Sequence, residues 1–366
     1  MSDIESGVKV NVPIQSIMSS IIDELSAGGG TDFKLLQNGD VYFISNAGAK
    51  RTQHNCKEWF EIAESYLFRM NPSALERFRK NPINSIDAGV SVGTKRARVV
   101  LTRSYRGRDL TVRILPERIL TVQELRLPPQ VIAKFREERE GMIVFVGETG
   151  SGKTTATASL IADRMAYRKH GGGLLTMEDP IEYEHVPTDK LWVTQWELGL
   201  HFSSYRAALR TGMRMHPTDI LLQEIRMEPD ELTGKMISSA ASAVNAAMSG
   251  HLLTTSYHAA DPIGGVMRIV GEMKDNGVAD AVGMLCSVLR MVVSMRLVTS
   301  PVDGAKVGLH EVLMITDPIA SMLRDGLNKG NLNEVRRKIE TNQDGCQSFE
   351  ESTKRAVSSG LLRHTM

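Results

Sequence analysis

The residues from Met142 to Thr155, MIVFVGETGSGKTT, contain the pattern that decides the fold. A run of apolar, β-prone residues ends at Val146, and the next eight residues match the pattern G-x-x-x-x-G-K-[ST]. Glycines let backbone N–H groups turn inward around phosphate oxygens, and a following helix directs its positive N-terminal end to the same place. The stretch therefore predicts a strand, a phosphate-binding loop and a helix that begins at Lys153.

This loop predicts a site for ATP and Mg²⁺. Lys153 would contact the β- and γ-phosphates, and the Thr154 hydroxyl would bind Mg²⁺. A glycine-rich turn that matches by chance is the alternative, and the strand and helix patterns on either side disfavour it. The expected nucleotide-binding residues are Gly147, Glu148, Thr149, Gly150, Ser151, Gly152, Lys153, Thr154 and Thr155.

Composition narrows the class of protein. The chain has 366 residues, and its 44 Lys and Arg against 43 Asp and Glu give a net charge of +1. No overall basic excess is present, so direct nucleic-acid binding is not expected. Cys56, Cys286 and Cys346 form no C-x-x-C pair, which favours a reduced, cytosolic chain. The N-terminus lacks a signal-peptide pattern, and no segment approaches the ~20 apolar residues that span a bilayer.

Residues 1–115 predict a smaller α+β domain. Asn38-Gly39 is a strong hairpin-turn signal between two short strands, and apolar residues at helical spacing from Trp59 to Met70 indicate a helix with one buried face. Prolines bracket residues 116–130, which we expect to be a linker. The expected elements of the first domain are a helix at 12–25, strands at 32–36 and 41–44, a helix at 59–70, and strands at 88–92, 97–104 and 109–115.

Residues 131–366 alternate between strand and helix patterns. This alternation predicts a mostly parallel sheet covered on both faces, with ligands at the carboxyl ends of the strands. The apolar stretch 281–295 is interpreted as a buried helix, and the tail from Ile319 as helical and charged. The other expected elements are strands at 142–146, 174–177, 220–223 and 252–257 and helices at 153–166 and 231–248.

Polar residues follow the predicted strands. Glu178 ends the second strand and Glu224 the third, while His251 precedes the fourth and His258 closes it. Phosphoryl transfer to water needs a group that orients or deprotonates the water. It also needs metal ligands, and cations that stabilise the developing charge. The two carboxylates are placed for the first two tasks. Taken singly each signal is weak, because such a carboxylate is often a helix cap and a lone histidine is more often structural.

Four motifs in order resemble a known family. The phosphate loop, LLTMEDPIEYEH, ILLQEIR and GHLLTTSYHAADP are similar to the Walker A, Asp-box, Walker B and His-box motifs of the secretion ATPase superfamily, which serves type II and type IV secretion and pili. The resemblance runs from about Thr31 to Leu362. It implies an α/β fold: a RecA-like P-loop ATPase domain at 131–366, preceded by a PAS-like α+β domain at 1–115.

The resemblance also assigns roles residue by residue. Glu178 and Glu224 would handle water and metal, with Thr154 and Glu178 as the metal ligands, and His251 would sense the γ-phosphate. Arg210 and Arg214 match arginines near a subunit boundary, whereas Arg98 and Arg113 match N-terminal-domain arginines that reach a nucleotide. Solvated surface charge is the alternative for all four arginines. The implied catalytic set is Glu178, Glu224, His251, Arg210 and Arg113.

Departures from the common motifs narrow the resemblance. Gln223 stands where P-loop enzymes usually carry Asp, Met227-Glu228 replace the usual residues after Walker B, and three cysteines cannot form a tetracysteine metal site. These features are most similar to the DotB-like and TraJ-like ATPases of type IVB secretion and conjugation. They imply a hexamer at the cytoplasmic face of a secretion or conjugation apparatus, peripherally associated with the inner membrane complex. A pilus retraction motor, a DNA translocase and a nucleotide-gated assembly factor with little turnover are the alternatives.

Overall fold

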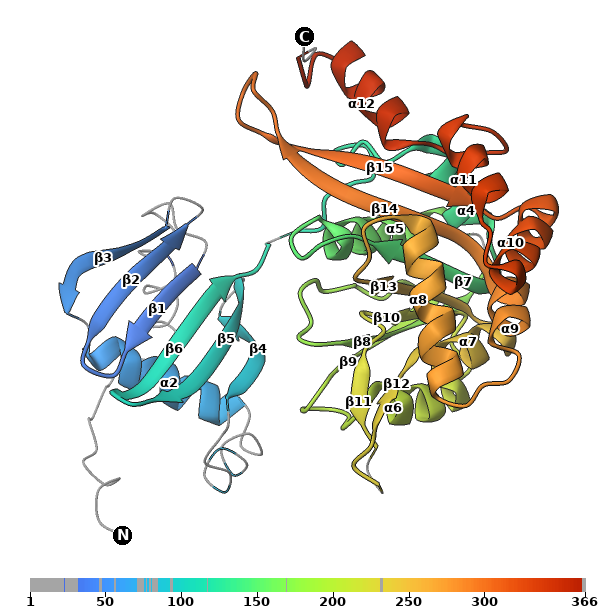
Figure 1. Cartoon of the computed structure of the whole chain (residues 1–366). Coiled ribbons are helices and arrows are strands. Elements are labelled where there is room, and N and C mark those ends of the chain that lie inside the picture. The colour runs from blue at the N-terminus through green and yellow to red at the C-terminus, as the bar shows by residue number, and fades with distance from the viewer. Residues whose placement is uncertain are drawn as a thin grey trace. The chain divides into compact units, whose positions relative to one another are not determined.

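The computed structural model describes residue 23 and residues 32–45, 48–55, 57–70, 76, 78, 80, 85–92, 95–116, 118–168, 170–230 and 233–363. The chain divides into two compact units (Figure 1). One comprises the described residues up to Arg118 together with Asp179–Glu184, and the other comprises Ile119–Glu178 and the residues from His185 onward. The helix predicted at 12–25 lies outside the described residues except for Asp23.

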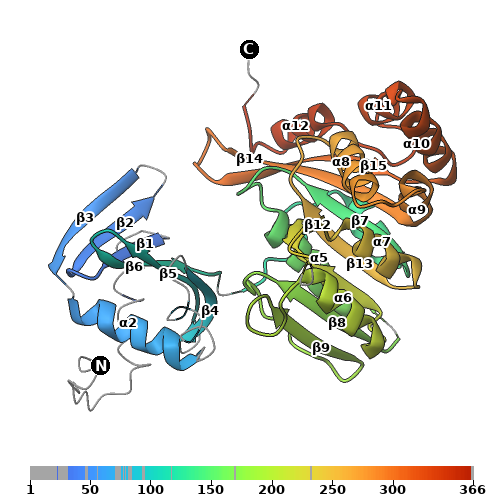
Figure 2. The ribbon, with the colours of Figure 1, turned by 60° about the horizontal axis from the view of Figure 1, so that its bottom comes forward.

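The first unit is an antiparallel sheet with a helix on one face (Figure 2). Phe33 and Leu35 alternate inward from the sheet and pack with Phe60 and Leu67 of the helix, so the strand and helix periods meet in one core. The predicted strands and helix of this unit are confirmed. The strand order is β3-β2-β1-β6-β5-β4. The elements are β1 (Asp32–Leu36), β2 (Asp40–Ser45), β3 (Gly48–Asn55), α2 (Lys57–Met70), β4 (Ile86–Val92), β5 (Lys95–Ser104) and β6 (Gly107–Ile114).

The second unit is built on a seven-stranded sheet in the order β15-β14-β7-β13-β10-β8-β9. All neighbouring strands pair in parallel except β15, which is antiparallel to β14. The predicted mostly parallel α/β sheet is thus confirmed. The strands are β7 (Gly141–Val146), β8 (Gly172–Glu178), β9 (Leu191–Glu197), β10 (Asp219–Leu222), β13 (Leu252–Tyr257), β14 (Leu289–Thr299) and β15 (Lys306–Met314).

Helices cover both faces of this sheet. α5 contacts β7 and β13 and packs with α4, whereas the helices from α6 to α9 contact one another in a layer on the other face. A short ribbon joins β11 (Met227–Pro229) to β12 (Met236–Ser238). The helices are α4 (Pro129–Glu137), α5 (Lys153–Tyr167), α6 (Tyr205–Gly212), η1 (Met213–Met215), α7 (Ala240–Met248), α8 (Pro262–Asp275), α9 (Ala281–Val288), α10 (Asp317–Lys329), α11 (Asn333–Glu340) and α12 (Phe349–Ser358).

Two predicted helices are wrong in part. The buried helix at 281–295 is α9 followed by residues 289–295 of β14, because periodicity cannot separate a buried helix from a buried strand in a short apolar run. The helix predicted at 231–248 begins only at Ala240, since Met236–Ser238 pair with β11. Within the predicted linker 116–130, Val122 and Leu127 are buried in the core of the second unit. In the described part of the chain, no helix is both long and apolar enough to cross a membrane.

Candidate functional site

The phosphate loop follows β7, a strand buried along its whole length, and leads directly into α5. At Gly147 (φ 150°) a Cβ atom would lie 2.5 Å from the Ser151 hydroxyl and 2.7 Å from the Met295 carbonyl oxygen, so this turn requires glycine. Gly152 precedes α5 in a left-handed conformation (φ 92°), and no side chain caps the helix. The N–H groups of the first turn of α5 therefore stay available for an anion.

Two polar side chains of the loop are buried in a way that fits phosphate. Lys153 is 9% exposed, and its ammonium donates to the carbonyl oxygens of Gly147 and Glu148, both at 2.8 Å. Burial lowers the pKa of Lys153, and the carboxylate of Glu224 opposes this effect. The buried Ser151 hydroxyl has no hydrogen-bond partner among the described residues. A phosphate group would supply both a counter-charge and acceptor oxygens at this place.

Glu224 and His258 meet at the carboxyl ends of two neighbouring strands. His258 Nε2 lies 2.8 Å from Glu224 Oε1. The backbone before Glu224 is fixed to β13, because the Ser256 hydroxyl donates to the Gln223 carbonyl oxygen at 2.6 Å. β13 separates β10 from β7, so the strand that Glu224 follows lies about 10 Å from the strand that precedes the phosphate loop. Loop, carboxylate and histidine thus share one edge of the sheet.

Glu178 lies at the same edge but one strand further out. Its side chain is 2% exposed, and Oε1 accepts from the Thr176 hydroxyl at 2.6 Å and from Gln195 Nε2 at 3.1 Å. β8 is three strand spacings, about 14 Å, from β7. These two hydrogen bonds hold the Glu178 carboxylate against Thr176 and Gln195. Its predicted roles in catalysis and metal binding stay predictions.

The only loop hydroxyl predicted to hold Mg²⁺ is that of Thr154, at the first turn of α5. Within the part of the chain that the structure describes, no group of three or more His, Cys, Asp or Glu side chains could hold a metal ion. Mg²⁺ commonly keeps several waters and binds through few protein ligands and phosphate oxygens. A single threonine hydroxyl beside a phosphate loop fits that pattern.

His251 lies at the opposite edge of the sheet from the phosphate loop. It precedes Leu252, which pairs with Gly141 at the start of β7, and six residues of strand, about 20 Å, separate it from the loop edge. Its Nδ1 lies 3.0 Å from the Ala246 carbonyl oxygen, and the side chain is buried. The structure does not bring His251 together with the loop; the histidine at the loop edge is His258, which closes β13. In a parallel sheet, a residue that precedes a strand lies at the amino edge. The strand predicted at 252–257 therefore already placed His251 at the amino edge, away from the loop.

The four predicted arginines fall into two pairs. Arg210 is exposed in the last turn of α6, and Arg214 is exposed in η1. Arg98 and Arg113 are opposite each other on β5 and β6 of the first unit. Arg98 Nε donates to Asp87 Oδ1 at 3.0 Å, and Arg113 Nε donates to Asp32 Oδ1 at 2.6 Å. The functions predicted for these arginines stay predictions.

We expect His258→Ala to lower ATP turnover by about tenfold, because Glu224 loses a hydrogen-bonding partner that orients it. His251→Ala, at the other end of the same strand, should leave turnover per folded molecule unchanged. Steady-state phosphate release, normalised to the folded fraction from thermal melts, makes this comparison. A larger loss of turnover in His251→Ala than in His258→Ala would contradict the assignment.

These observations define a P-loop nucleotide-binding domain in which a carboxylate and a histidine follow two neighbouring strands at the same sheet edge as the loop. The chain belongs to the family of type II/IV secretion system proteins, which matches residues 85–361. It is 29% identical over 271 residues to the type IV pilus retraction ATPase PilT of Pseudomonas aeruginosa, covering 74% of each chain.

Two solved structures are similar over nearly the whole chain. The ATPase DotB of Legionella pneumophila superposes with a TM-score of 0.76 at 21% identity, covering 96% of this chain and 93% of that one. The pilus retraction motor PilT with bound ADP superposes with a TM-score of 0.76 at 26% identity, covering 94% and 93%. The fold is therefore that of RecA-like secretion ATPases with an N-terminal domain.

Proposed function

We propose that this protein is a hexameric ATPase that powers a type IVB-like secretion or conjugative transfer system from the cytoplasmic face of the inner membrane. The observation that carries the proposal is the Glu224–His258 pair, which lies on the same sheet edge as the loop of Lys153. A carboxylate at that edge can act on water, while the loop holds the phosphates. The names of the related ATPases support ATP as the nucleotide.

Different residues bind the phosphates and activate the water. Lys153 exchanges its two carbonyl partners for phosphate oxygens, and Ser151 donates to the same group. Glu224 orients the attacking water and accepts its proton, while His258 holds the carboxylate in place. Mg²⁺, when bound at Thr154, would neutralise charge that develops on the phosphate oxygens.

Sequence departures support the type IVB-like assignment over a pilus retraction motor. Gln223, Met227 and Glu228 differ from the usual Walker B surroundings, and no tetracysteine site can form. The similarity to PilT keeps pilus retraction as the second candidate. Measuring substrate transfer and pilus retraction side by side, in a host that lacks this chain, separates the two systems.

Activity is expected to depend on assembly, because the exposed Arg210 is placed by resemblance at a subunit boundary. A cation from a neighbouring subunit stabilises transition-state charge and is worth roughly 10³-fold in rate or more. Specific activity should therefore rise with protein concentration and reach a plateau as a ring forms. Arg210→Ala should lower turnover more than it lowers nucleotide affinity.

Mixing Arg210→Ala with Lys153→Ala chains should partly restore activity. The intact phosphate loop of an Arg210→Ala subunit can then meet the intact Arg210 of a Lys153→Ala subunit across the subunit boundary. Arg337→Ala, an exposed arginine of α11, is the matched control and should behave as the parent. Constant specific activity at every concentration, together with no restoration on mixing, would rule out a ring whose subunits complete one another.

A further inference from the structure

The chain that follows Glu224 runs directly into the ribbon strand β11, which lies beside α6 (Figure 1). This short segment is fixed on two sides. The Ile225 N–H donates to the Ser256 carbonyl oxygen at 3.0 Å, and the Arg226 N–H donates to the Ser239 hydroxyl at 3.1 Å. β13 and the start of α7 therefore hold the backbone between Glu224 and β11 in one position.

Glu228, in β11, caps the N-terminus of α6. The residue is 5% exposed, and its two carboxylate oxygens accept from the Tyr205 N–H at 2.7 Å and from the Arg206 N–H at 3.3 Å. The first turn of a helix leaves its N–H groups without partners inside the helix, and a carboxylate there also interacts favourably with the helix dipole. Glu228 satisfies two of these groups from a position 23 residues after Tyr205.

Further contacts join the same two segments. The Arg226 Cζ lies 4.8 Å from the centroid of the Tyr205 ring, and Arg206 Nη1 lies 3.1 Å from Asp230 Oδ2. Burial raises the pKa of Glu228, and the N–H groups of Tyr205 and Arg206, together with the Arg226 guanidinium, oppose this rise. Donors and cations thus compensate the buried carboxylate at the first turn of α6.

α6 carries Arg210 at its other end. Five residues of helix, about 7.5 Å, separate Arg210 from Tyr205. Tyr205 and Leu209 are buried, whereas Arg210 is exposed. A helix of eight residues has little stability of its own, so tertiary contacts at its ends decide its direction. A tilt of α6 at its N-terminus therefore displaces Arg210.

We propose that Glu228 is a positioning residue, which fixes the N-terminus of α6 to the segment after Glu224 and thereby sets where Arg210 lies. The proposal rests on the proposed function in taking Arg210 as a group that completes the site of a neighbouring subunit. It links the carboxylate that acts on water in one site to the arginine that the same chain supplies to the next.

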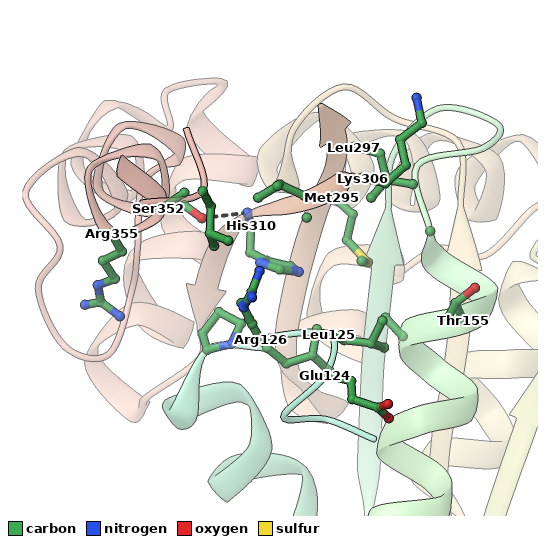
Figure 3. A pocket seen from close by; sticks show the side chains of 18 of the residues that line it. Glu124, Leu125, Arg126, Thr155, Met295, Leu297, Lys306, His310, Ser352 and Arg355 are labelled. Carbon is green, nitrogen blue, oxygen red and sulfur yellow. Dashed lines mark hydrogen bonds between the residues drawn. The ribbon is translucent and has the colours of Figure 1, made fainter. Parts of the chain in front are cut away.

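Nucleotide binding should not depend on Glu228. A cavity of about 560 Å³ opens beside the phosphate loop, with Gly152 and Thr155 in its wall (Figure 3). None of the described residues that line this cavity comes from α6 or from residues 226–230. A change at Glu228 therefore leaves the surroundings of the loop intact, and we expect turnover and nucleotide affinity to separate.

Glu228→Gln tests the proposal in the full-length protein. The amide keeps the shape of the side chain but loses the charge and one acceptor oxygen, so we expect ATP turnover to fall about tenfold while MgADP affinity stays within about twofold. In the Arg210→Ala background, the same substitution should lower turnover by less than about twofold, because the group that it positions is already absent. Glu334→Gln, which removes an exposed carboxylate from the first turn of α11, is the matched control and should change neither property.

Mixing of variants distinguishes an effect through Arg210 from an effect through Glu224. Glu228→Gln chains have an intact phosphate loop, so Lys153→Ala chains should restore part of their activity by supplying a correctly placed Arg210 across the subunit boundary. A Glu224 side chain that is displaced within its own subunit could not be restored in this way.

Equal loss of turnover in the parent and in the Arg210→Ala background, or no restoration on mixing with Lys153→Ala, would overturn the proposal. Should Glu228→Gln not fold, Asp230→Asn removes the neighbouring ion pair to Arg206 and should show the same two signatures with a smaller loss, about threefold. Parental turnover in Arg210→Ala would overturn the assembly-dependent function as well, so the two failures are distinguishable.

Discussion

Replacing Lys153 by alanine is expected to lower ATP hydrolysis by roughly 100- to 1000-fold and to weaken nucleotide binding strongly. The Lys153 ammonium is buried between the carbonyl oxygens of Gly147 and Glu148, so it is already positioned where phosphate oxygens would arrive. Its pKa is lowered by burial, and an anionic phosphate would relieve that cost by favouring the charged form. Phosphate release and nucleotide titration on the purified variant measure the two losses.

Lys274→Ala is the matched control, because this lysine is exposed on α8. The control should retain parental binding and turnover. Hydrolysis at the parental rate by folded Lys153→Ala would show that nucleotide is hydrolysed elsewhere in the chain.

Replacing Glu224 by glutamine is expected to lower turnover by roughly 100- to 10,000-fold while nucleotide affinity stays within a few-fold of the parent. The carboxylate lies two strands from the loop and contacts His258, so it is placed to act on water and not to hold phosphate. Nucleotide affinity depends instead on Lys153 and on backbone N–H groups of the loop. Equilibrium titration and steady-state phosphate release separate the two properties.

Glu140→Gln is the matched control, since Glu140 is an exposed residue that precedes β7 at the opposite edge of the same sheet. It should change neither property. If Glu178→Gln stopped turnover and Glu224→Gln did not, the water-handling role would belong to Glu178 despite its greater distance from β7.

The fold was predictable wherever local pattern and burial agree. The apolar run of β7 followed by the glycine loop fixed the strand, turn and helix, and strand–helix alternation predicted the parallel sheet. Pattern failed where tertiary contacts decide the outcome. Leu289–Met295 continue an apolar helix in sequence but form a strand because β7 offers a partner edge, and the polar strand β3 has no apolar alternation to reveal it.

The candidate site was predictable in its position and less so in its members. Glu224 was expected at the carboxyl edge because it follows a strand, and the structure places it there with His258. The motif match favoured His251, whereas strand direction favours His258. The hydrogen bond from Gln195 to Glu178 depends on the pairing of β9 with β8, which no local pattern encodes.

The chemical state of bound nucleotide tests the central claim most directly. Parent protein and Glu224→Gln, each assembled with MgATP, are quenched in acid after one incubation, and the ATP and ADP bound to each are measured. The predicted result is bound ADP in the parent and bound, unhydrolysed ATP in Glu224→Gln. Bound ADP at the same level in both proteins would contradict the role of Glu224, and unhydrolysed ATP in the parent at every protein concentration would contradict the ATPase itself.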